Sequence, residues 1–365
     1  MQKLKPQNEI VCNWPEGKTV PTVVVRCLVC NHGPFIERCL QGFLMQETDF
    51  PFEVYIHDDA STDGSTDIVK RYAERYPRIL KPVCETENQW SKGSEHFHEI
   101  TWAPVLHGAH KYIALCEGDD YWTDPKKLQK QVEYMETHPG CAGCFHERVR
   151  CDEEGGIMEG TGLPDDHKRV LTGDDIASEQ YLPPTCTAMY RHEVLADRPA
   201  ALNSWWAGDK ATALWAAYYH GTIDWVEGIL PSVYRVHEGG VWSGADVLTR
   251  RIMVYATTQQ AICFFPVSRQ TIHFIRQKRK KEVFWFWRKW HGSEVPEERQ
   301  KVRALVRQEV SAWPPLRWWL LRKQLGYWLE QWRLVAWHGV VLGVKRILPR
   351  GLYQWGHRVL KGKGE

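Results

Sequence analysis

The apolar and polar positions of the chain follow two periods that alternate along its first half. Short runs rich in β-branched and aromatic residues predict buried strands, and apolar residues spaced three and four apart predict amphipathic helices. The predicted strands are residues 22–29, 52–56 and 111–116, and the predicted helices are residues 35–46, a stretch from residue 65, and a stretch after Pro125. Strands that alternate with helices in this way are typical of βαβ units, so we predict an α/β protein with a mostly parallel sheet.

The second half of the chain begins with shorter elements and then changes character. We predict a helix at residues 211–219 and short strands at residues 223–226 and 232–236. Residues 151–172 are rich in Gly, Asp and Glu and are typical of an inserted loop, to which no role is assigned. Beyond residue 248 only helical periodicity remains. The pattern therefore predicts an α/β domain at residues 20–245 and a helical region at residues 246–365.

Composition and charge exclude several classes of protein. Of the 365 residues 43% are hydrophobic and 25% are charged, so the chain is not collagen-like, disordered or a small disulfide-stapled domain. Its net charge of +2 conceals a division, because residues 276–365 contain 21 Lys and Arg against 7 Asp and Glu. The same segment contains 10 of the 19 tryptophans. This asymmetry predicts a basic arm that seeks an anionic surface.

The cysteines and the first residues of the chain provide evidence on the cellular compartment of the protein. Most of the 11 cysteines lie in apolar runs, where Cys behaves as a small buried hydrophobe. Two Cys-x-x-Cys pairs, Cys27/Cys30 and Cys141/Cys144, leave a zinc site as an alternative, but the pairs are too far apart for a zinc ribbon. Residues 1–8 have no apolar core behind them, so we predict no signal peptide and a cytoplasmic protein.

Two acidic clusters follow predicted strands. Open α/β sheets bind ligands at the carboxyl ends of their strands, so residues 57–64 and Glu117–Asp120 are candidate site segments. The first cluster is equally explained as a turn with a helix cap. In the second, three carboxylates within four residues repel one another unless a cation balances them. The favoured cation to neutralise these carboxylates is magnesium or manganese that also bridges a diphosphate.

A bound diphosphate suggests a nucleotide-sugar substrate, which also needs a base. The diphosphate leaves from the sugar's C1 while a carboxylate removes a proton from the attacking hydroxyl. Asp209 is the candidate, because it lies in the first turn of a predicted helix downstream of both clusters. A plain helix cap is the alternative for this residue.

Taken in order, these segments resemble a known family. The chain carries Asn31-His32, then Asp58 to Asp63, then Glu117 to Trp122, then Asp209 at a helix start, and finally Tyr234-Arg235-Val236-His237. From about Thr22 to Ser243 this order and spacing resemble a bacterial family 2 glycosyltransferase of the GT-A fold.

The resemblance implies a nucleotide site. The residue that matches Asp59 contacts the nucleobase in that family, typically uracil, and those that match Cys30 and Asn31 lie along the base and ribose. Glu117 corresponds to the first acid of the family's Asp-x-Asp motif and is implied to lie near the ribose. The more usual residue at that position is Asp.

The resemblance also implies a metal site and a base. Asp119 would hold Mn²⁺ or Mg²⁺, Asp120 would share that duty, and His237 would complete the coordination. Asp209 matches the catalytic base, although Gly208 precedes it where many relatives have an acid.

The implied reaction is a single displacement with inversion. Asp209 deprotonates an acceptor hydroxyl, and the hydroxyl attacks C1 of a nucleotide sugar, most simply a UDP-sugar. The implied acceptor is a glycan or lipid-linked glycan in surface polysaccharide synthesis. A sugar-nucleotide nucleotidyltransferase is an alternative, although an early Gly-rich phosphate loop is missing. A catalytically inactive binding or scaffold subunit is a second alternative.

The basic tail favours a surface over nucleic acid. Residues 277–281 are basic and residues 284–290 combine Trp and Phe with Arg and Lys, as membrane interfaces favour. No nucleic-acid fold accompanies them, so we expect no nucleic-acid partner. The uncharged run at residues 334–344 is shorter than a membrane span. The periodicity of Leu321, Leu325, Trp328, Trp332 and Val335 also fits a helix that packs on the protein or forms a homo-oligomer. We expect a peripheral protein at the inner face of the cell membrane.

Overall fold

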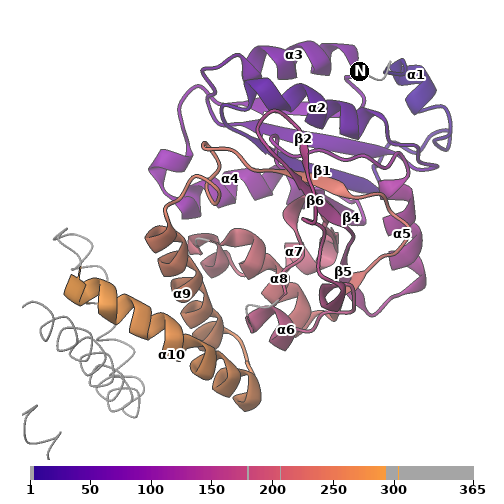
Figure 1. The fold of residues 1–365 in the computed structure, drawn as a ribbon. Helices are drawn as coiled ribbons and strands as arrows, with labels where there is room; N and C mark the ends of the chain where they lie inside the picture. The colour runs from indigo at the N-terminus through magenta and orange to yellow at the C-terminus, as the bar shows by residue number, and fades with distance from the viewer. Residues whose placement is uncertain (1–3, 179–180, 206, 293–302, 304–365) are drawn as a thin grey trace, which may run out of the picture. The chain divides into compact units, whose positions relative to one another are not determined.

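The computed structural model describes residues 4–178, 181–205, 207–292 and 303 (Figure 1). The chain divides into two compact units, Met1–Ile275 and Arg276–Glu365. The first unit takes in residues 246–275, which the sequence pattern assigned to the helical region. The predicted features at residues 321–335 and 334–344 lie outside the described residues.

A seven-stranded sheet forms the centre of the first unit. Its strand order is β3-β2-β1-β4-β8-β5-β9, and every neighbouring pair is parallel except the two pairs that β8 makes. The strands are β1 (Val23–Val29), β2 (Phe52–Asp58), β3 (Leu80–Cys84), β4 (Tyr112–Leu115), β5 (Cys141–Phe145), β8 (Met189–Arg191) and β9 (Thr222–Trp225). The predicted α/β class with a mostly parallel sheet is confirmed.

Helices cover both faces of this sheet. Above it in Figure 1 lie α2 (Gly33–Leu44) and α3 (Ser65–Arg75), and below it lie α4 (Ser94–Leu106), α7 (His192–Ala196) and α8 (Gly208–Tyr219). The remaining α-helices are α1 (Gln7–Ile10), α5 (Lys127–Thr137), α6 (Gly173–Ala177), α9 (Val247–Phe264) and α10 (Arg269–Gly292). Short 3-10 helices are η1 (Trp90–Lys92), η2 (Asp165–His167), η3 (Thr185–Thr187) and η4 (Ala200–Ser204). None of the helices in the described part of the chain is both long and apolar enough to cross a membrane.

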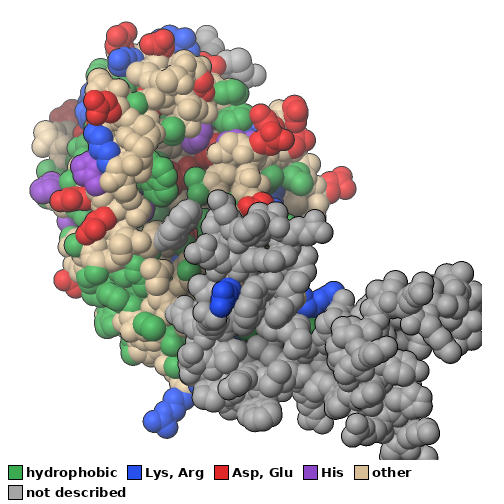
Figure 2. Space-filling model, turned by 90° about the vertical axis from the view of Figure 1, so that its left-hand side faces the viewer, with side chains coloured by type: hydrophobic (Ala, Val, Ile, Leu, Met, Phe, Trp, Pro, Cys, Tyr) green, Lys and Arg blue, Asp and Glu red, His purple; other side chains and the backbone are tan. Residues whose placement is uncertain are grey.

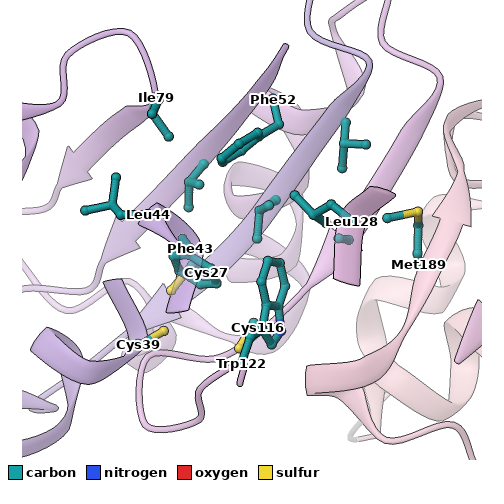
Figure 3. Packing of buried hydrophobic residues seen from close by; sticks show 14 of the residues in the cluster. Cys27, Cys39, Phe43, Leu44, Phe52, Ile79, Cys116, Trp122, Leu128 and Met189 are labelled. Carbon is teal, nitrogen blue, oxygen red and sulfur yellow. The ribbon is translucent and has the colours of Figure 1, made fainter. Parts of the chain in front are cut away.

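The central strands are apolar on both faces because both faces are covered. In β1, Val23, Val25, Cys27 and Val29 enter one hydrophobic cluster and Val24 enters the other. Successive side chains of a strand point to opposite faces, so a strand between two helical layers needs a continuous apolar run. Figure 3 shows part of the first cluster, with Cys27, Cys39 and Cys116 near one another and Phe43 close to Trp122. The rings of Phe43 and Trp122 meet edge to face with centroids 4.8 Å apart.

Several elements had no prediction from the sequence, and three of them help to build the main sheet or cover it. These three are β3, α4 and β5. Strand β3 contains Lys81 and Pro82 and lies at the sheet edge, where Pro is tolerated. Helix α4 contains Pro104 and has apolar residues on several sides, so its period is weak. Helix α5 begins at Lys127, and Asp124 accepts a hydrogen bond from the backbone N–H of Lys126 at 2.8 Å.

The segment predicted as an inserted loop at residues 151–172 contributes Cys151 and strand β7 (Ile157–Met158) to a second, smaller sheet, and its remaining residues lie outside that sheet. The strand order of that sheet is β10-β6-β7, formed by β6 (Arg148–Cys151), β7 and β10 (Ser232–Arg235). Strands β6 and β7 make an antiparallel hairpin, and β6 pairs with β10 in parallel. The hairpin is thereby attached to the strand that leads to His237.

Acidic side chains dominate the charge of the first unit. Residues 1–275 contain 38 Asp and Glu against 26 Lys and Arg. Figure 2 shows Asp and Glu side chains at many points over the upper part of one face, with Lys and Arg between some of them.

Candidate active site

Two tight turns meet where β1 and β2 end. Asn31 and Ala60 both adopt a left-handed backbone with φ of 56°. The backbone N–H of Asn31 donates to Ser61 Oγ at 2.8 Å, and Asn31 Oδ1 accepts from the backbone N–H of Thr62 at 2.8 Å. A left-handed Ala costs roughly 1 kcal/mol. Backbone strain of this kind gathers at binding sites, which agrees with the predicted position of Asn31.

Asp59 is an anchor for the next loop in this structure. Its side chain is 2% exposed, and its two oxygens accept the backbone N–H groups of Gln89 at 2.5 Å and Trp90 at 3.1 Å. This holds the Trp90 indole at the surface, where it is 41% exposed. Cys30 lies beside the same turn, with its thiol 3.8 Å from the Asp59 carbonyl oxygen. Cys30 and Asp59 therefore lie at the same turn, and the contacts of both residues with a nucleoside stay predictions.

The other acids of the first cluster serve the turn. Asp58 accepts from the backbone and hydroxyl of Ser61, and Asp63 Oδ2 accepts from the backbone N–H of Gly33 at 2.7 Å. The turn interpretation of residues 57–64 accounts for these two side chains.

The second cluster begins directly after β4. Gly118 is buried, and its N–H donates to the Leu28 carbonyl at 2.8 Å, which fixes the turn against β1. Burial raises the pKa of Glu117 to about 7, partly offset by Arg26, and the negative charges of Asp119 and Asp209 add to the increase. The carboxylates of Glu117, Asp119 and Asp209, up to 92 residues apart in the sequence, therefore interact electrostatically.

Asp119 and His237 form a direct pair. Asp119 Oδ2 lies 3.1 Å from His237 Nε2, and the other carboxylate oxygen is buried with no hydrogen-bond partner among the described residues. Burial alone raises the pKa of Asp119, but the hydrogen bond from His237 and the nearby His32 outweigh it, so the pKa is below its ordinary value. The ring of His32 lies 6.2 Å from that of His237, and its Nδ1 is also buried without a partner. An unpartnered carboxylate oxygen beside an imidazole fits a divalent cation.

The Asp120 carboxylate contacts the backbone of β10. The residue is 2% exposed, and its Oδ1 accepts from the backbone N–H of Arg235 at 2.9 Å. Within the described residues no group of three His, Cys, Asp or Glu side chains is arranged to hold a metal. The predicted share of Asp120 in metal binding therefore finds no support in its contacts, because a backbone donor already occupies one of its oxygens.

Asp209 is the second residue of α8, and it does not cap that helix. Ala207 is the N-cap residue, and Asp209 Oδ1 accepts from the backbone N–H of Lys210 at 2.7 Å. The residue is exposed, yet the protein around it desolvates the carboxylate and raises its pKa, partly offset by Lys210. Asp209 also acts on Glu117, as described above. An accessible carboxylate with a raised pKa suits a general base.

Sequence reasoning missed a buried histidine beside Gly208 and the two arginines that act on it. His98 on α4 is 9% exposed, and neither of its ring nitrogens has a partner. A Cβ atom on Gly208 would lie 3.0 Å from the His98 ring, so Gly208 permits this approach. Burial together with the charges of Arg26 and Arg198 lowers the pKa of His98 to about 4. The available signal was Arg26, a charged residue inside an apolar strand.

Arg26 is held beneath Glu117. It is 6% exposed, and its guanidinium donates to the Thr101 carbonyl at 3.2 Å and to the Thr101 hydroxyl at 2.6 Å. It also lies 4.3 Å above the Trp102 ring. Burial lowers its pKa to about 10, against the opposing effect of Glu117. Arg26 thus supplies a positive charge below the acidic turn.

The mostly parallel sheet with acidic turns at its strand ends is that of the GT-A fold, and comparison with known proteins agrees. Residues 23–198 match the model of the family described as Glycosyl transferase family 2. Over these residues, the resemblance seen in the sequence is confirmed.

Relatives and solved structures extend the comparison. The uncharacterized protein Rv1520 of Mycobacterium tuberculosis is 34% identical over 219 residues, which are 59% of this chain and 59% of that protein. The putative teichuronic acid biosynthesis glycosyltransferase TuaG of Bacillus subtilis is 29% identical over 133 residues, or 36% of this chain and 47% of TuaG. The chain thus spans less than two thirds of these relatives.

Two solved structures share the fold. TarS 1-349 of S. aureus in complex with UDP-GlcNAc has a TM-score of 0.56 at 20% identity, over 77% of this chain and 78% of that one. The mannosyltransferase PcManGT of Pyrobaculum calidifontis, in complex with GDP-Man and Mn²⁺, has a TM-score of 0.51 at 19% identity, over 84% and 85% of the two chains.

Proposed function

We propose that this protein transfers a sugar from a nucleotide-sugar donor to an acceptor hydroxyl with inversion at C1. The observation that carries the proposal is the convergence of Asp209 with Glu117 and with the Asp119–His237 pair, although these residues lie far apart in the sequence. Carboxylates that crowd together in this way are costly unless function retains them.

In this proposal Asp119 and His237 hold Mn²⁺ or Mg²⁺. Support comes from the 3.1 Å contact between them and from the unpartnered oxygen of Asp119. The cation would neutralise charge on the departing nucleoside diphosphate. The turn at Cys30, Asn31 and Asp59 would receive the nucleoside, and a UDP-sugar is the favoured donor. TarS has been solved with UDP-GlcNAc and PcManGT with GDP-Man and Mn²⁺, which supports a donor of this chemical class.

Asp209 would act as the base. Its raised pKa makes it a better proton acceptor than an ordinary Asp, and its exposure allows a hydroxyl to reach it. The proton passes from the acceptor hydroxyl to the carboxylate as the oxygen attacks C1 from the side opposite the leaving group. Attack from that side inverts the configuration. Arg26 and the buried, neutral His98 lie close to Glu117 and Gly208, where they support the surface on which the donor sugar would rest.

The test is Asp209→Asn in the full chain. We expect transfer to fall by about 10²–10⁴-fold, because the amide cannot accept the proton, while UDP affinity changes less than about twofold. Asp67→Asn is the matched control, since Asp67 is an exposed acid in the first turn of α3. Turnover by Asp209→Asn at the rate of the control would refute the base assignment. Absence of donor turnover in the unaltered protein would instead favour the inactive scaffold subunit.

The acceptor is proposed to be a glycan or a lipid-linked glycan in surface polysaccharide synthesis. The name of TuaG supports this class, because it places that relative in teichuronic acid biosynthesis. Product analysis with lipid-linked and free glycans would distinguish the two kinds of acceptor.

We further propose that the basic region from residue 276 binds the inner face of the cell membrane. The support is its charge, 21 Lys and Arg against 7 Asp and Glu, and its 10 tryptophans. The full chain should sediment with vesicles that contain anionic lipid and should be released by salt. Lys278→Glu with Lys280→Glu should weaken binding, whereas Lys70→Glu with Lys126→Glu, at exposed positions on the first unit, should weaken it less. If the full chain does not sediment with the anionic vesicles, the membrane proposal fails, and a helix that packs on protein or forms a homo-oligomer is favoured instead.

A further inference from the structure

Arg235 connects three segments that surround the Asp119–His237 pair. It is the last residue of β10, lies two residues before His237, and is 4% exposed. Its backbone N–H donates to Asp120 Oδ1 at 2.9 Å, and its Nε donates to the backbone carbonyl of Asp119 at 3.2 Å. Arg235 therefore joins strand β10 to the acidic turn through two hydrogen bonds, one from its backbone and one from its side chain.

The third segment is the hairpin that the sequence left without a role. Arg235 Nη1 donates to the backbone carbonyls of Asp152 at 3.1 Å and Glu153 at 2.8 Å, in the turn between β6 and β7. Strand β6 also pairs with β10, with Arg235 opposite Cys151. The hairpin thus holds the guanidinium through Nη1, while Nε contacts the acidic turn.

An aromatic ring completes the support. The guanidinium of Arg235 lies 4.6 Å from the centre of the Phe35 ring, and the same ring lies 5.0 Å from that of His237. Phe35 therefore packs against both Arg235 and His237. The side chain of His237 is 7% exposed, which agrees with an imidazole restrained by its neighbours.

The partners of the guanidinium are carbonyl groups. No Asp or Glu carboxylate of the described residues forms an ion pair with it. A buried arginine without a counter-ion costs free energy, so charge neutralisation does not explain its presence. Its fixed fork of donors, which Lys lacks, does explain how three carbonyls are held at once.

We propose that Arg235 is a positioning residue that fixes His237 against Asp119, with Asp120 and the β6–β7 turn as its two fixed points. The inference rests on the proposed function, in which Asp119 and His237 hold the cation. It gives Asp120 a structural task, that of accepting the Arg235 backbone N–H. It also gives the hairpin a task, since its carbonyls orient the guanidinium.

The first experiment measures Mn²⁺ affinity of the full chain without nucleotide, from the electron paramagnetic resonance signal of free Mn²⁺. Arg235→Lys keeps the charge but loses the fork, and we expect Mn²⁺ binding to weaken by about 10-fold or more, as for other residues that support metal ligands. The matched control is Arg150→Lys, at an exposed position on the adjacent strand β6. The control should bind Mn²⁺ within about twofold of the unaltered protein, and circular dichroism should show both variants folded.

The second experiment separates positioning from direct ligation and serves even if Arg235→Lys does not fold. Asp120→Asn retains an oxygen that accepts the Arg235 N–H, whereas Asp120→Ala does not. If Asp120 acts through Arg235, the Asn variant should keep Mn²⁺ affinity within about threefold and the Ala variant should lose about 10-fold or more.

The outcomes are distinct. Unchanged Mn²⁺ affinity in Arg235→Lys, or equal losses in the two Asp120 variants, would overturn the positioning role while leaving the proposed function intact. If the unaltered protein does not bind Mn²⁺, the metal part of the proposed function fails, and the role of Arg235 fails with it.

Discussion

Gly118 offers a sharp test of the packing beneath the acidic turn. A Cβ atom at this position would lie 2.8 Å from His32 Nδ1, 2.8 Å from Val29 Cγ2 and 3.1 Å from Ile36 Cδ1. Val29 is 2% exposed and Ile36 is fully buried, so neither can move aside freely. Gly118→Ala therefore overpacks the site, at a cost of about 1–3 kcal/mol.

Part of this cost is offset because Ala lowers the conformational entropy of the unfolded chain. That gain is about 0.4–1 kcal/mol, so the net loss in the free energy of unfolding is roughly 1–2 kcal/mol. For a unit of this size the melting temperature should fall by about 2–8 °C. The added methyl group also pushes His32 and the residues that flank Gly118, so Mn²⁺ affinity should fall as well.

The assay is thermal unfolding followed by circular dichroism, together with Mn²⁺ binding. Gly140→Ala is the matched control, because a Cβ atom at Gly140 meets nothing within 4 Å and its backbone is not left-handed. The control should melt at or slightly above the temperature of the unaltered protein. If Gly118→Ala melts with the control and binds Mn²⁺ normally, the turn is looser than the structure indicates.

Three further predictions follow from buried groups. The pKa of Glu117 is about 7 in the folded protein against an ordinary 4.5, so the folded state holds the extra proton between these values and the free energy of unfolding falls as pH rises through them. Denaturant titrations in chelator should show that Glu117→Gln removes about 1–3 kcal/mol of this decline, and an unchanged pH profile would contradict the assignment. The pKa of His110 is lowered by burial from 6.5 to about 4, so the unfolded state binds the extra proton and stability is lost as pH falls from about 6.5 to 4. His110→Phe should lose less stability over that window, and an equal loss would mean that His110 does not titrate there. Finally, Asp59→Ala should speed hydrogen exchange of the Gln89 and Trp90 amides, because it removes their acceptor, while exchange in β4 serves as the internal reference.

Much of the fold could be predicted from periodicity. Apart from Arg26, the run Val23 to Val29 is apolar, and a strand covered on both faces satisfies such a run. Edge strand β3 and helix α4 escaped prediction because Pro82 and Pro104 contradict the local rules, and long-range packing decided their structure. The role of the hairpin at β6 and β7 escaped for a similar reason, since its strand partner β10 follows more than 80 residues later.

The sequence analysis selected candidate site residues, but it did not reveal which contacts each of their side chains makes. Asp119 and Asp209 could be chosen because acids at strand and helix ends are typical of ligand sites, whereas His237 was chosen from the family resemblance. The duties of Asp59 and Asp120 could not be predicted, because both carboxylates accept backbone N–H groups from segments 30 and 115 residues away.

By itself the sequence determined the alternation of strands and helices, the acidic turns after β2 and β4, and the division of charge at about residue 276, because each depends on neighbours in the chain. Only the tertiary structure decided which acids face one another, that Arg26 lies under Glu117, and that Arg235 joins three segments. Local periodicity indicates whether a strand or helix is buried on one face or on two. Contacts between distant segments depend on how the layers pack. These contacts decide whether a given carboxylate can serve as a ligand, as a base or as an acceptor for backbone N–H groups.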